Sequence, residues 1–471
     1  MTVSAELPAL TLRQQSDLLH RRAVSPVELA DAYLARIAAL NPTLNAYYTV
    51  TAEAARAQAE QAEAELAAGT DRGPLHGIPI GLKDLLATAG VRTTAGSKIL
   101  ADWVPAEDAT AVRRLRAAGA VCLGKCAMTE FAMGHPHNPH YGPTRNPWDL
   151  ERTPGGSSSG SAAATAAGLA SATIGSDTAC SIRQPAAYCG LAGLRPTHGR
   201  LSLAGVVPLS QSFDTIGPIA RTVEDAALLL QALAGPDVAD PATEPVPVPD
   251  YRAALAPGLQ GLRVGVPRPY FWDRLDDAVA AAVEEALAVL RQLGARVADI
   301  ELPGLDEALA ARQTVNDAEA YAIHAAWLRE RREDYGDEVG GRLPRGADLS
   351  GEAVTRAQER VRRFVADTHA LLGEHDVLVT PTTPTPAWRF DTPLASVGGA
   401  EEPNRTLGLR LTIPFSTLGG PSLSVPCGFS TEGLPIGLQI AGRRWDEATV
   451  LRVGHAYEQA TDWHRRRPPL A

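Results

Sequence analysis

The sequence predicts an α/β fold, in which a β-sheet carries helices on both of its faces. Short apolar runs alternate with helical segments of roughly ten residues, as strands and helices do in such folds. Strand-like runs recur from Ile78 to Ile440. Because they span most of the chain, we expect one large domain and not two independent ones.

The first half of the chain carries clear signals for its helices and strands. Ser25, Pro26 and Glu28 combine a serine N-cap, a proline in the first turn and an early acid. The expected elements are helices at 10–40, 51–68 and 110–118, an apolar Ala-rich segment at 162–170, and strands at 78–82, 120–124 and 171–175.

The second half repeats the alternation after a surface connection. Residues 236–257 are dense in Pro, Asp and Val, which is typical of an extended segment. Residues 304–372 have a helical pattern and more charge, so we expect a helical flank there. The remaining expected elements are strands at 261–267, 375–381, 422–425 and 436–440 and helices at 277–293 and 447–461.

The composition limits the classes of function. The 44 Lys and Arg against 54 Asp and Glu give a net charge of −10, which argues against direct nucleic-acid binding through a broad basic face. Residues 1–15 lack the pattern of a secretory signal, and no uncharged apolar run reaches the ~18 residues that span a bilayer. We therefore expect a cytoplasmic protein without a membrane segment.

The number and spacing of the five cysteines are consistent with a cytoplasmic location. Their number is odd and their spacing fits no disulfide framework, which is typical of a reducing cytosol. No second Cys or His pair with zinc-like spacing accompanies Cys122 and Cys126. We expect buried free thiols, no metal and no cofactor.

The stretch 154–161 is the most informative part of the sequence. A Gly/Ser octet is usually a flexible linker. This one runs directly into the apolar segment 162–170 and the strand at 171–175, and a second small-residue loop, 176–183, follows. Flexible linkers do not enter a core, so we interpret the two hydroxyl-rich loops as the floor of a catalytic site.

Ser181 lies at the expected start of a helix that runs from Ile182. Free backbone N–H groups and the positive end of the helix dipole are found at such a start, and they are components of an oxyanion hole. A serine nucleophile also needs a base, and no local motif places a histidine beside Ser181. Lys83 ends a buried strand and would act as the base if burial keeps it neutral, although strand-end lysines are more often surface residues. Asp84 need not pair with it, because successive residues of an extended chain point opposite ways.

Three long segments resemble the amidase signature family: GIPIGLKDLL (77–86), PTRNPWDLERTPGGSSSGSAAATAAG (143–168) and GSDTACSIRQPAAYCGLAGLRPTHGR (175–200). Shorter matches lie at 129–134, 217–225, 379–382 and 434–439. The family includes fatty-acid amide hydrolase, malonamidase, aryl and peptide amidases, and the A subunit of glutamyl-tRNA amidotransferase. The resemblance implies a single large α/β/α body with a central mixed sheet. We expect residues 1–70 to be a helical flank packed on the core and residues 71–471 to be the catalytic domain, which includes the flank at 304–372.

The resemblance also assigns the chemistry. The family's Ser–cisSer–Lys triad falls on Ser181, Ser157 and Lys83. It implies that Ser181 attacks an amide carbonyl to form an acyl-enzyme, that Ser157, preceded by a cis peptide bond, relays a proton, and that neutral Lys83 is the final base. The backbone N–H groups implied to hold the oxyanion are those of Thr178, Ala179, Cys180 and Ser181.

Two departures from the family bear on the substrate. Ala179 and Cys180 stand where the family commonly has Gly-Gly, and we expect the Cys180 thiol to be buried, inert and directed away from its neighbour's side chain. In the amidotransferase member of the family, an aspartate before a Thr-Ile-Pro motif meets the ammonium of glutamine, but here residues 406–414 carry Arg410 and no acid. The candidate substrate-binding residues are Met133, Gly134, Ser158 and Arg410, with Arg389 as a second arginine that would meet a substrate carboxylate.

We therefore predict a free-standing amidohydrolase that releases ammonia or an amine from a small-molecule carboxamide, and a homodimer is a possible assembly of it. The first alternative is the A subunit of a glutamyl-tRNA(Gln)/aspartyl-tRNA(Asn) amidotransferase, which implies two partner subunits. The second alternative is a silent binding protein with the amidase fold, in which Ala179 and Cys180 disrupt the oxyanion hole.

Overall fold

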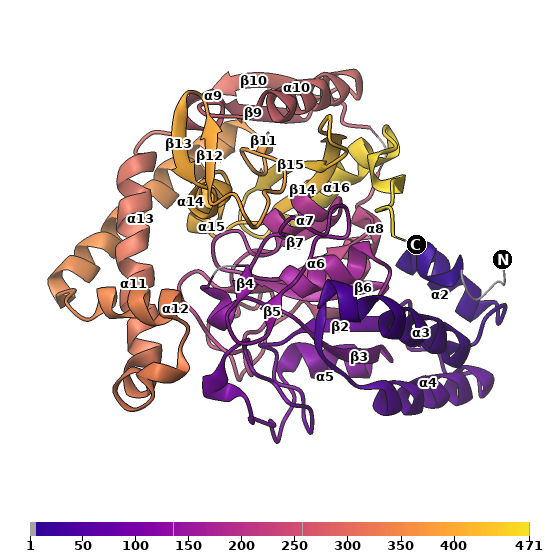
Figure 1. The fold of residues 1–471 in the computed structure, drawn as a ribbon. Helices are drawn as coiled ribbons and strands as arrows, with labels where there is room; N and C mark the ends of the chain where they lie inside the picture. The colour runs from indigo at the N-terminus through magenta and orange to yellow at the C-terminus, as the bar shows by residue number, and fades with distance from the viewer. Residues whose placement is uncertain (1–5, 135, 257, 471) are drawn as a thin grey trace.

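The described residues form one central sheet of 11 strands (Figure 1). The structure is a computed structural model and describes residues 6–134, 136–256 and 258–470. The strands of this sheet are β1 (Tyr47–Val50), β2 (Pro79–Lys83), β3 (Val121–Cys126), β6 (Ala172–Asp177), β7 (Ala192–Arg195), β8 (Thr215–Ala220), β9 (Arg263–Pro267), β10 (Arg296–Ile300), β11 (Val377–Pro381), β14 (Ser422–Phe429) and β15 (Pro435–Gly442). Two small hairpins lie outside it, made of β4 (His137–Asn138) with β5 (Gly142–Pro143) and β12 (Leu394–Val397) with β13 (Ala400–Pro403).

The sheet is mixed, as predicted. Its strand order is β1-β3-β2-β6-β8-β7-β14-β15-β11-β9-β10. Strand β2 runs parallel to β3 and β6, and β9 runs parallel to β10 and β11. The other neighbouring pairs are antiparallel. The predicted α/β class is confirmed.

Helices cover both faces of the sheet. They are α2 (Leu12–His20), α3 (Pro26–Leu44), α4 (Ala52–Ala67), α5 (Thr110–Ala117), α6 (Ser159–Ala166), α7 (Arg183–Cys189), α8 (Val223–Leu233), α9 (Arg268–Phe271), α10 (Asp277–Gln292), α11 (Leu305–Glu330), α12 (Asp337–Arg342), α13 (Gly351–Glu374), α14 (Asn404–Leu409), α15 (Ile413–Leu418) and α16 (Glu447–Gln459). Strand β7 shows the two faces, because a Cβ added at Gly193 would lie 2.5 Å from Ala186 of α7, whereas Leu194 packs in a cluster with Leu229 of α8. Successive strand residues face opposite sides, so α7 and α8 lie on different faces.

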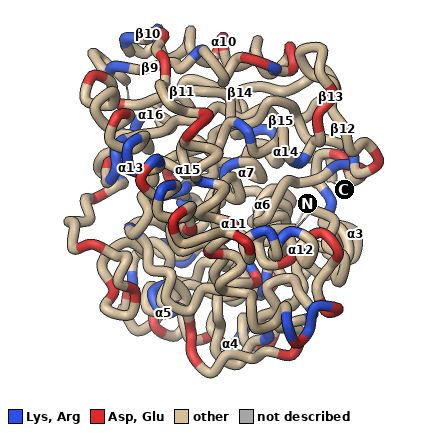
Figure 2. The backbone as a smooth tube through the Cα atoms, turned by 90° about the vertical axis from the view of Figure 1, so that its left-hand side faces the viewer, with Lys and Arg blue, Asp and Glu red and all other residues tan. Residues whose placement is uncertain are grey.

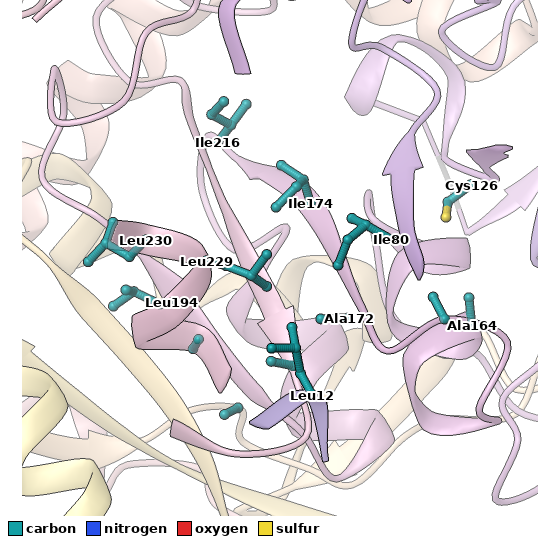
Figure 3. Packing of buried hydrophobic residues seen from close by; sticks show 14 of the residues in the cluster. Leu12, Ile80, Cys126, Ala164, Ala172, Ile174, Leu194, Ile216, Leu229 and Leu230 are labelled. Carbon is teal, nitrogen blue, oxygen red and sulfur yellow. The ribbon is translucent and has the colours of Figure 1, made fainter. Parts of the chain in front are cut away.

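The core lies between the sheet and the layer that contains α8. Figure 3 shows Ile80 of β2, Ile174 of β6 and Leu194 of β7 beside Leu229 of α8. Leu12 of α2 joins the same cluster from the start of the chain. Burying each of these side chains contributes about 1.5–3 kcal/mol. This core holds β2 and β6 rigidly at the edge where the functional side chains emerge.

The first 70 residues contribute more than helices. The predicted helices at 10–40 correspond to α2 and α3, and the predicted helix at 51–68 corresponds to α4. Strand β1 lies between α3 and α4 and pairs with β3. This strand was missed because its four residues interrupt a strongly helical composition. Residues 1–5, 135, 257 and 471 of the two predicted domain ranges lie outside the described residues.

Other strands were missed because their sequences look unlike strands. Strand β7 contains Gly193 and Arg195, and β8 contains Gly217 and Pro218, yet both are buried. Their context in the centre of the sheet, which no local pattern reveals, decides their structure. Helix α8 and strand β10 were also not predicted.

The helical pattern predicted at 304–372 corresponds to α11, α12 and α13. Helices α11 and α13 pack against each other on the left-hand side of Figure 1, and both contact α15. Helix α11 thereby brings side chains from a segment that is distant in sequence to the same end of the sheet as the loop after β6.

Lys and Arg positions are interspersed with Asp and Glu positions along the backbone drawn in Figure 2. Among the described residues, no helix combines the length and the apolar character needed to cross a bilayer. All five cysteines are buried and free of disulfides, as predicted.

Candidate active site

A cavity lies at the edge of the sheet where β2 and β6 end. The parallel strands β2 and β6 present their carboxyl ends at this edge, which is a common location for sites in α/β proteins. The lining comes from the loop after β6, the loop before α6, and helices α11, α12 and α14. The lining residues are Thr129, Ala132, Met133, Gly134, Pro136, Gly156, Ser157, Thr178, Ala179, Cys180, Ser181, Gln184, Leu209, Arg312, Gln313, Asn316, Arg342, Trp388, Arg405, Leu409 and Ile413.

Lys83 is the last residue of β2 and is fully buried. Its Nζ donates hydrogen bonds to Ser157 Oγ at 2.6 Å and Ser176 Oγ at 2.9 Å. Burial lowers the pKa of Lys83 to about 7, although the more distant Asp177 opposes the shift. In the described part of the chain no carboxylate forms an ion pair with Lys83. A substantial fraction of this amine is therefore neutral near pH 7.

Asp84 lies on the other side of the strand from Lys83, as predicted. Its carboxylate accepts hydrogen bonds from the backbone N–H and the hydroxyl of Thr94. It also lies 3.7 Å from Nζ of Lys125 on β3. The carboxylate that adjoins Lys83 in sequence is therefore committed to a different lysine.

Ser157 lies in the loop that leads into α6 and follows a cis peptide bond from Gly156. This loop and the start of α6 are packed tightly. A Cβ at Gly160 would lie 2.2 Å from the carbonyl oxygen of Ala46 and 2.4 Å from the backbone nitrogen of Ala127, so only glycine fits there. The Gly/Ser octet is thus part of the core, as predicted, and not a linker.

Ser181 lines the same cavity as Ser157 and lies just before α7. A buried acid fixes the loop that carries it. Asp177 accepts a hydrogen bond from the backbone N–H of Ile182 at 3.1 Å and forms ion pairs with Arg183 at 3.0 Å and Arg195 at 3.5 Å. Burial raises the pKa of Asp177, but the two arginines outweigh it and lower the pKa to about 2, so the carboxylate is charged. The start of α7 is therefore held by a permanent charge network.

The loop 178–181 directs its carbonyl groups to side chains. The carbonyl of Thr178 accepts from Arg312 Nη2 at 2.7 Å, and that of Ala179 accepts from Arg183 Nη2 at 2.8 Å. Within the described residues, the backbone N–H groups of Thr178, Ala179, Cys180 and Ser181 donate to no protein acceptor. Four free N–H groups beside a serine hydroxyl are an arrangement suited to hold an oxyanion.

Cys180 departs from one expectation. Its thiol is buried and donates to the carbonyl of Gly156 at 3.3 Å, but Sγ also lies 3.9 Å from Ser181 Oγ and the residue lines the cavity. The side chain therefore does not point away from its neighbour's, because the cysteine side chain is turned toward the Gly156 carbonyl. Burial raises the pKa of the Cys180 thiol to about 12, so it is not a thiolate near pH 7.

The candidate substrate residues divide into two groups. Met133 and Gly134 line the cavity. The prediction for Ser158 was wrong, because its hydroxyl is buried against Ser176, donating to the carbonyl and accepting from the N–H.

The predictions for the two arginines were also wrong. Arg410 donates to the backbone carbonyls of Tyr270 and Asp273 and stacks on the Tyr270 ring, so its charge supports the turn before α10. Arg389 pairs with Asp391 on the surface. Neither arginine lines the cavity.

Sequence reasoning missed three arginines that do line the cavity: Arg312, Arg342 and Arg405. They come from α11, the end of α12 and α14, segments without a recognisable motif. For Arg312 and Arg342 the only available signal was the charged helical pattern of 304–372, which shows a flank but not which residues face a cavity, and Arg405 lies outside that pattern.

Comparison with known proteins agrees with this geometry. The family model described as Amidase matches residues 28–451. The chain belongs to the amidase family. It is therefore an enzyme that cleaves carbon–nitrogen bonds of amides.

One relative and two solved structures show how far the likeness extends. The chain is 47% identical to the A subunit of a glutamyl-tRNA(Gln) amidotransferase from Roseiflexus sp. (strain RS-1), over 98% of this chain and 99% of that protein. A structure described as a vestigial protein complex that reveals the origins of an s-triazine catabolic enzyme matches with a TM-score of 0.92 and 36% identity, covering 96% of this chain and 98% of that one. The native peptide amidase of Stenotrophomonas maltophilia matches with a TM-score of 0.86 and 35% identity, covering 98% of each chain.

Proposed function

We propose that the chain hydrolyses a carboxamide through an acyl-enzyme on Ser181. Ser181 Oγ attacks the carbonyl carbon while its proton passes to Ser157 Oγ, and the proton of Ser157 passes to Lys83 Nζ. The oxyanion accepts hydrogen bonds from the free N–H groups of loop 178–181. When the C–N bond breaks, Lys83 returns a proton through Ser157 to the departing nitrogen. Water then attacks the acyl ester and restores Ser181, with the same three side chains moving its proton.

The observation that supports this proposal most directly is the state of Lys83. It is buried, hydrogen-bonded only to hydroxyl groups in the described part of the chain, and has a pKa of about 7. A base with a pKa near the working pH is the most effective one. The alternative of a silent binding protein has less support, because Lys83 donates to Ser157 and because Ser157, Ser181 and the free N–H groups of loop 178–181 line one cavity.

Substitution of the nucleophile tests the proposal. Ser181→Ala is expected to lower amide hydrolysis by about 10⁶-fold while the thermal midpoint stays close to that of the parent protein. The measurement is ammonia release from a panel of primary amides. A Ser181→Ala protein that keeps more than a hundredth of the rate would show that another group is the nucleophile.

We propose glutamine as the amide and a glutamyl-tRNA(Gln) amidotransferase as the assembly. The support is the 47% and 45% identity, over nearly complete chains, to A subunits from Roseiflexus sp. and Moorella thermoacetica. These likenesses favour the amidotransferase alternative over the free-standing amidase that the sequence predicted. The proposal includes two partner subunits and a cytoplasmic location, where charged tRNA is made.

A free-standing amidase remains the second candidate because of one observation. No acidic side chain is among the described residues that line the cavity, so a glutamine ammonium would have no carboxylate partner. Turnover of glutamine only together with partner subunits and charged tRNA would support the first candidate. Turnover of other amides by the purified chain, without activity on glutamine, would support the second.

A further inference from the structure

Gln184 joins the loop of Ser157 to the start of helix α7. Its side chain is buried, and it lies in the first turn of α7, three residues after Ser181. The side-chain oxygen Oε1 accepts a hydrogen bond at 3.0 Å from the backbone N–H of Gly156, the residue directly before Ser157. The backbone N–H of Gln184 donates to the carbonyl of Cys180 at 2.8 Å. One residue therefore contacts both loops whose hydroxyl groups take part in the proposed reaction.

Only one orientation of the Gln184 amide satisfies both of its partners. The nitrogen Nε2 donates to the carbonyl of Gly408 on α14 at 2.8 Å. A flipped amide would place Nε2 against the N–H of Gly156 and Oε1 against the carbonyl of Gly408, so both bonds would be lost. A Cβ added at Gly408 would lie 2.6 Å from Nε2, so α14 approaches Gln184 closely because residue 408 is glycine. The two bonds thus hold the amide group on both sides.

A second contact between the same two loops is weaker. The carbonyl of Gly156 accepts a hydrogen bond from the thiol of Cys180 at 3.3 Å. A thiol is a weak hydrogen-bond donor, whereas a buried backbone N–H that loses its acceptor carries the full cost of its desolvation. The bond from Gly156 to Gln184 is therefore the stronger of the two that connect Gly156 to the residues around Ser181.

We propose that Gln184 is a positioning residue for the proton transfer between Ser157 and Ser181. The proposal rests on the hydrolysis proposed above, in which Ser157 accepts a proton from Ser181 and later delivers one to the departing nitrogen. Proton transfer needs donor and acceptor atoms about 2.6–3.2 Å apart, and a displacement of about 1 Å costs on the order of 100-fold in rate. By holding Gly156, Gln184 sets the position of the Ser157 hydroxyl relative to Ser181.

A matched amide and ester separate this role from a purely structural one. An amide nitrogen must gain a proton when it leaves, whereas p-nitrophenolate leaves as an anion. The substrates are the primary amide that the parent protein turns over fastest and the p-nitrophenyl ester of the same acyl group. The value of kcat/KM reports the steps up to the acyl-enzyme. Misalignment of Ser157 should lower kcat/KM for the amide more than for the ester, whereas a loss of folded protein lowers both equally.

Gln184→Met is the test variant, because methionine has a similar length and lacks the amide group. It should lower kcat/KM for the amide by ~100-fold and for the ester by ~10-fold or less, so that the amide-to-ester ratio falls by ~10-fold or more. Complete labelling with a fluorophosphonate counts competent Ser181 in each preparation. Gln58→Met is the matched control, since Gln58 also accepts from a backbone N–H, that of Cys122 at 2.8 Å, and does not line the cavity.

Gly408→Ala is a second variant that leaves Gln184 in the sequence. The added methyl group would lie 2.6 Å from Nε2 of Gln184 and should displace the same amide. We expect the amide-to-ester ratio to fall in this variant as well, by ~3-fold or more. If Gln184→Met does not fold, Gly408→Ala decides the question.

An amide-to-ester ratio equal to that of the parent protein in Gln184→Met, or in Gly408→Ala where Gln184→Met does not fold, would overturn the inference. Failure of the proposed hydrolysis has a different signature, because amide turnover would then survive Lys83→Ala, in which the final base is removed. A ratio that falls in Lys83→Ala and stays unchanged in Gln184→Met would confirm the proton relay and refute the role of Gln184.

Discussion

Lys83 and Lys125 are two fully buried lysines on the neighbouring parallel strands β2 and β3, and only Lys125 has a carboxylate beside it. Lys125 Nζ donates to the carbonyl of Leu86 and the hydroxyl of Thr93, each at 2.6 Å, and lies 3.7 Å from Asp84. Burial lowers the pKa of both amines, and a carboxylate opposes the shift in each case, the more distant Asp177 at Lys83 and the adjacent Asp84 at Lys125. The comparison shows that burial alone does not make a base, and that the partner decides the role.

Removing Lys83 gives the largest expected effect on the rate. Lys83→Ala is expected to lower kcat by about 10³- to 10⁴-fold, because Lys83 Nζ is the one hydrogen-bond partner of Ser157 Oγ within the described residues. Ammonia release at pH 7 measures the effect, and the thermal midpoint shows that the protein is folded. A variant with a rate near that of the parent protein would refute the assignment of the base.

A carboxylate placed beside Lys83 should make it resemble Lys125. Ser176 Oγ lies 2.9 Å from Lys83 Nζ, so Ser176→Asp would stabilise the protonated amine. A rise of ~2 pH units in the pKa of Lys83 would lower the rate at pH 7 by ~100-fold and restore it at higher pH. Ser176→Asn is the matched uncharged control. If Ser176→Asp and Ser176→Asn have the same pH–rate profile, the charge state of Lys83 does not control the reaction.

The pH dependence of the parent protein follows from the same amine. Lys83 acts in its neutral form, and its pKa is about 7. The value of kcat/KM should therefore fall about tenfold per pH unit below pH 7 and level off above it. A profile that is flat between pH 5 and 8 would contradict this prediction.

Lys125 is expected to contribute to stability and to affect the rate only a few-fold. Lys125→Ala leaves Asp84 buried and without its charge partner, which costs about 3–5 kcal/mol. The thermal midpoint should fall, while kcat per competent Ser181 stays within ~3-fold of the parent value. The double variant Lys125→Ala/Asp84→Asn should have a higher thermal midpoint than Lys125→Ala, because the unpaired buried carboxylate is removed. A large loss of kcat without a change in the thermal midpoint would show that Lys125 takes a direct part in the reaction.

Cys180 should give the smallest effect, despite its position 3.9 Å from Ser181 Oγ. Burial raises the pKa of its thiol to about 12, so thiolate is nearly absent near pH 7. Cys180→Ala is therefore expected to keep its rate within ~3-fold. Iodoacetamide should leave the parent protein active. Inactivation by that reagent, absent in Cys180→Ala, would show a reactive thiol in the cavity.

The positions of residues in or next to a motif could be predicted from the sequence. The family segments contain Lys83, Ser157 and loop 178–181; Ser157 and the loop line one cavity, and Lys83 donates a hydrogen bond to Ser157. The opposite orientation of Asp84 followed from the geometry of an extended chain, and the burial of the Gly/Ser octet followed from the apolar segments after it. Each of these inferences needed only neighbouring residues or a long motif.

Long-range contacts could not be predicted in this way. Arg312 lies 131 residues after Ser181 on a helix without a motif, and only the packing of α11 brings it to loop 178–181. Arg410 was misjudged because its partners, the carbonyls of Tyr270 and Asp273, come from a turn in which Tyr270 has a φ of 71°. No local pattern indicates a turn of that kind beside Arg410.

The loop that carries Ser181 is also held by segments near the end of the chain. Arg183, two residues after Ser181, donates to the carbonyl of Thr412 at 2.9 Å and to the side chain of Gln439 on β15 at 2.7 Å. A growing chain lacks these acceptors until its last strands have left the ribosome. Until then, the loop that carries Ser181 lacks two of the hydrogen bonds that hold Arg183 in the folded protein.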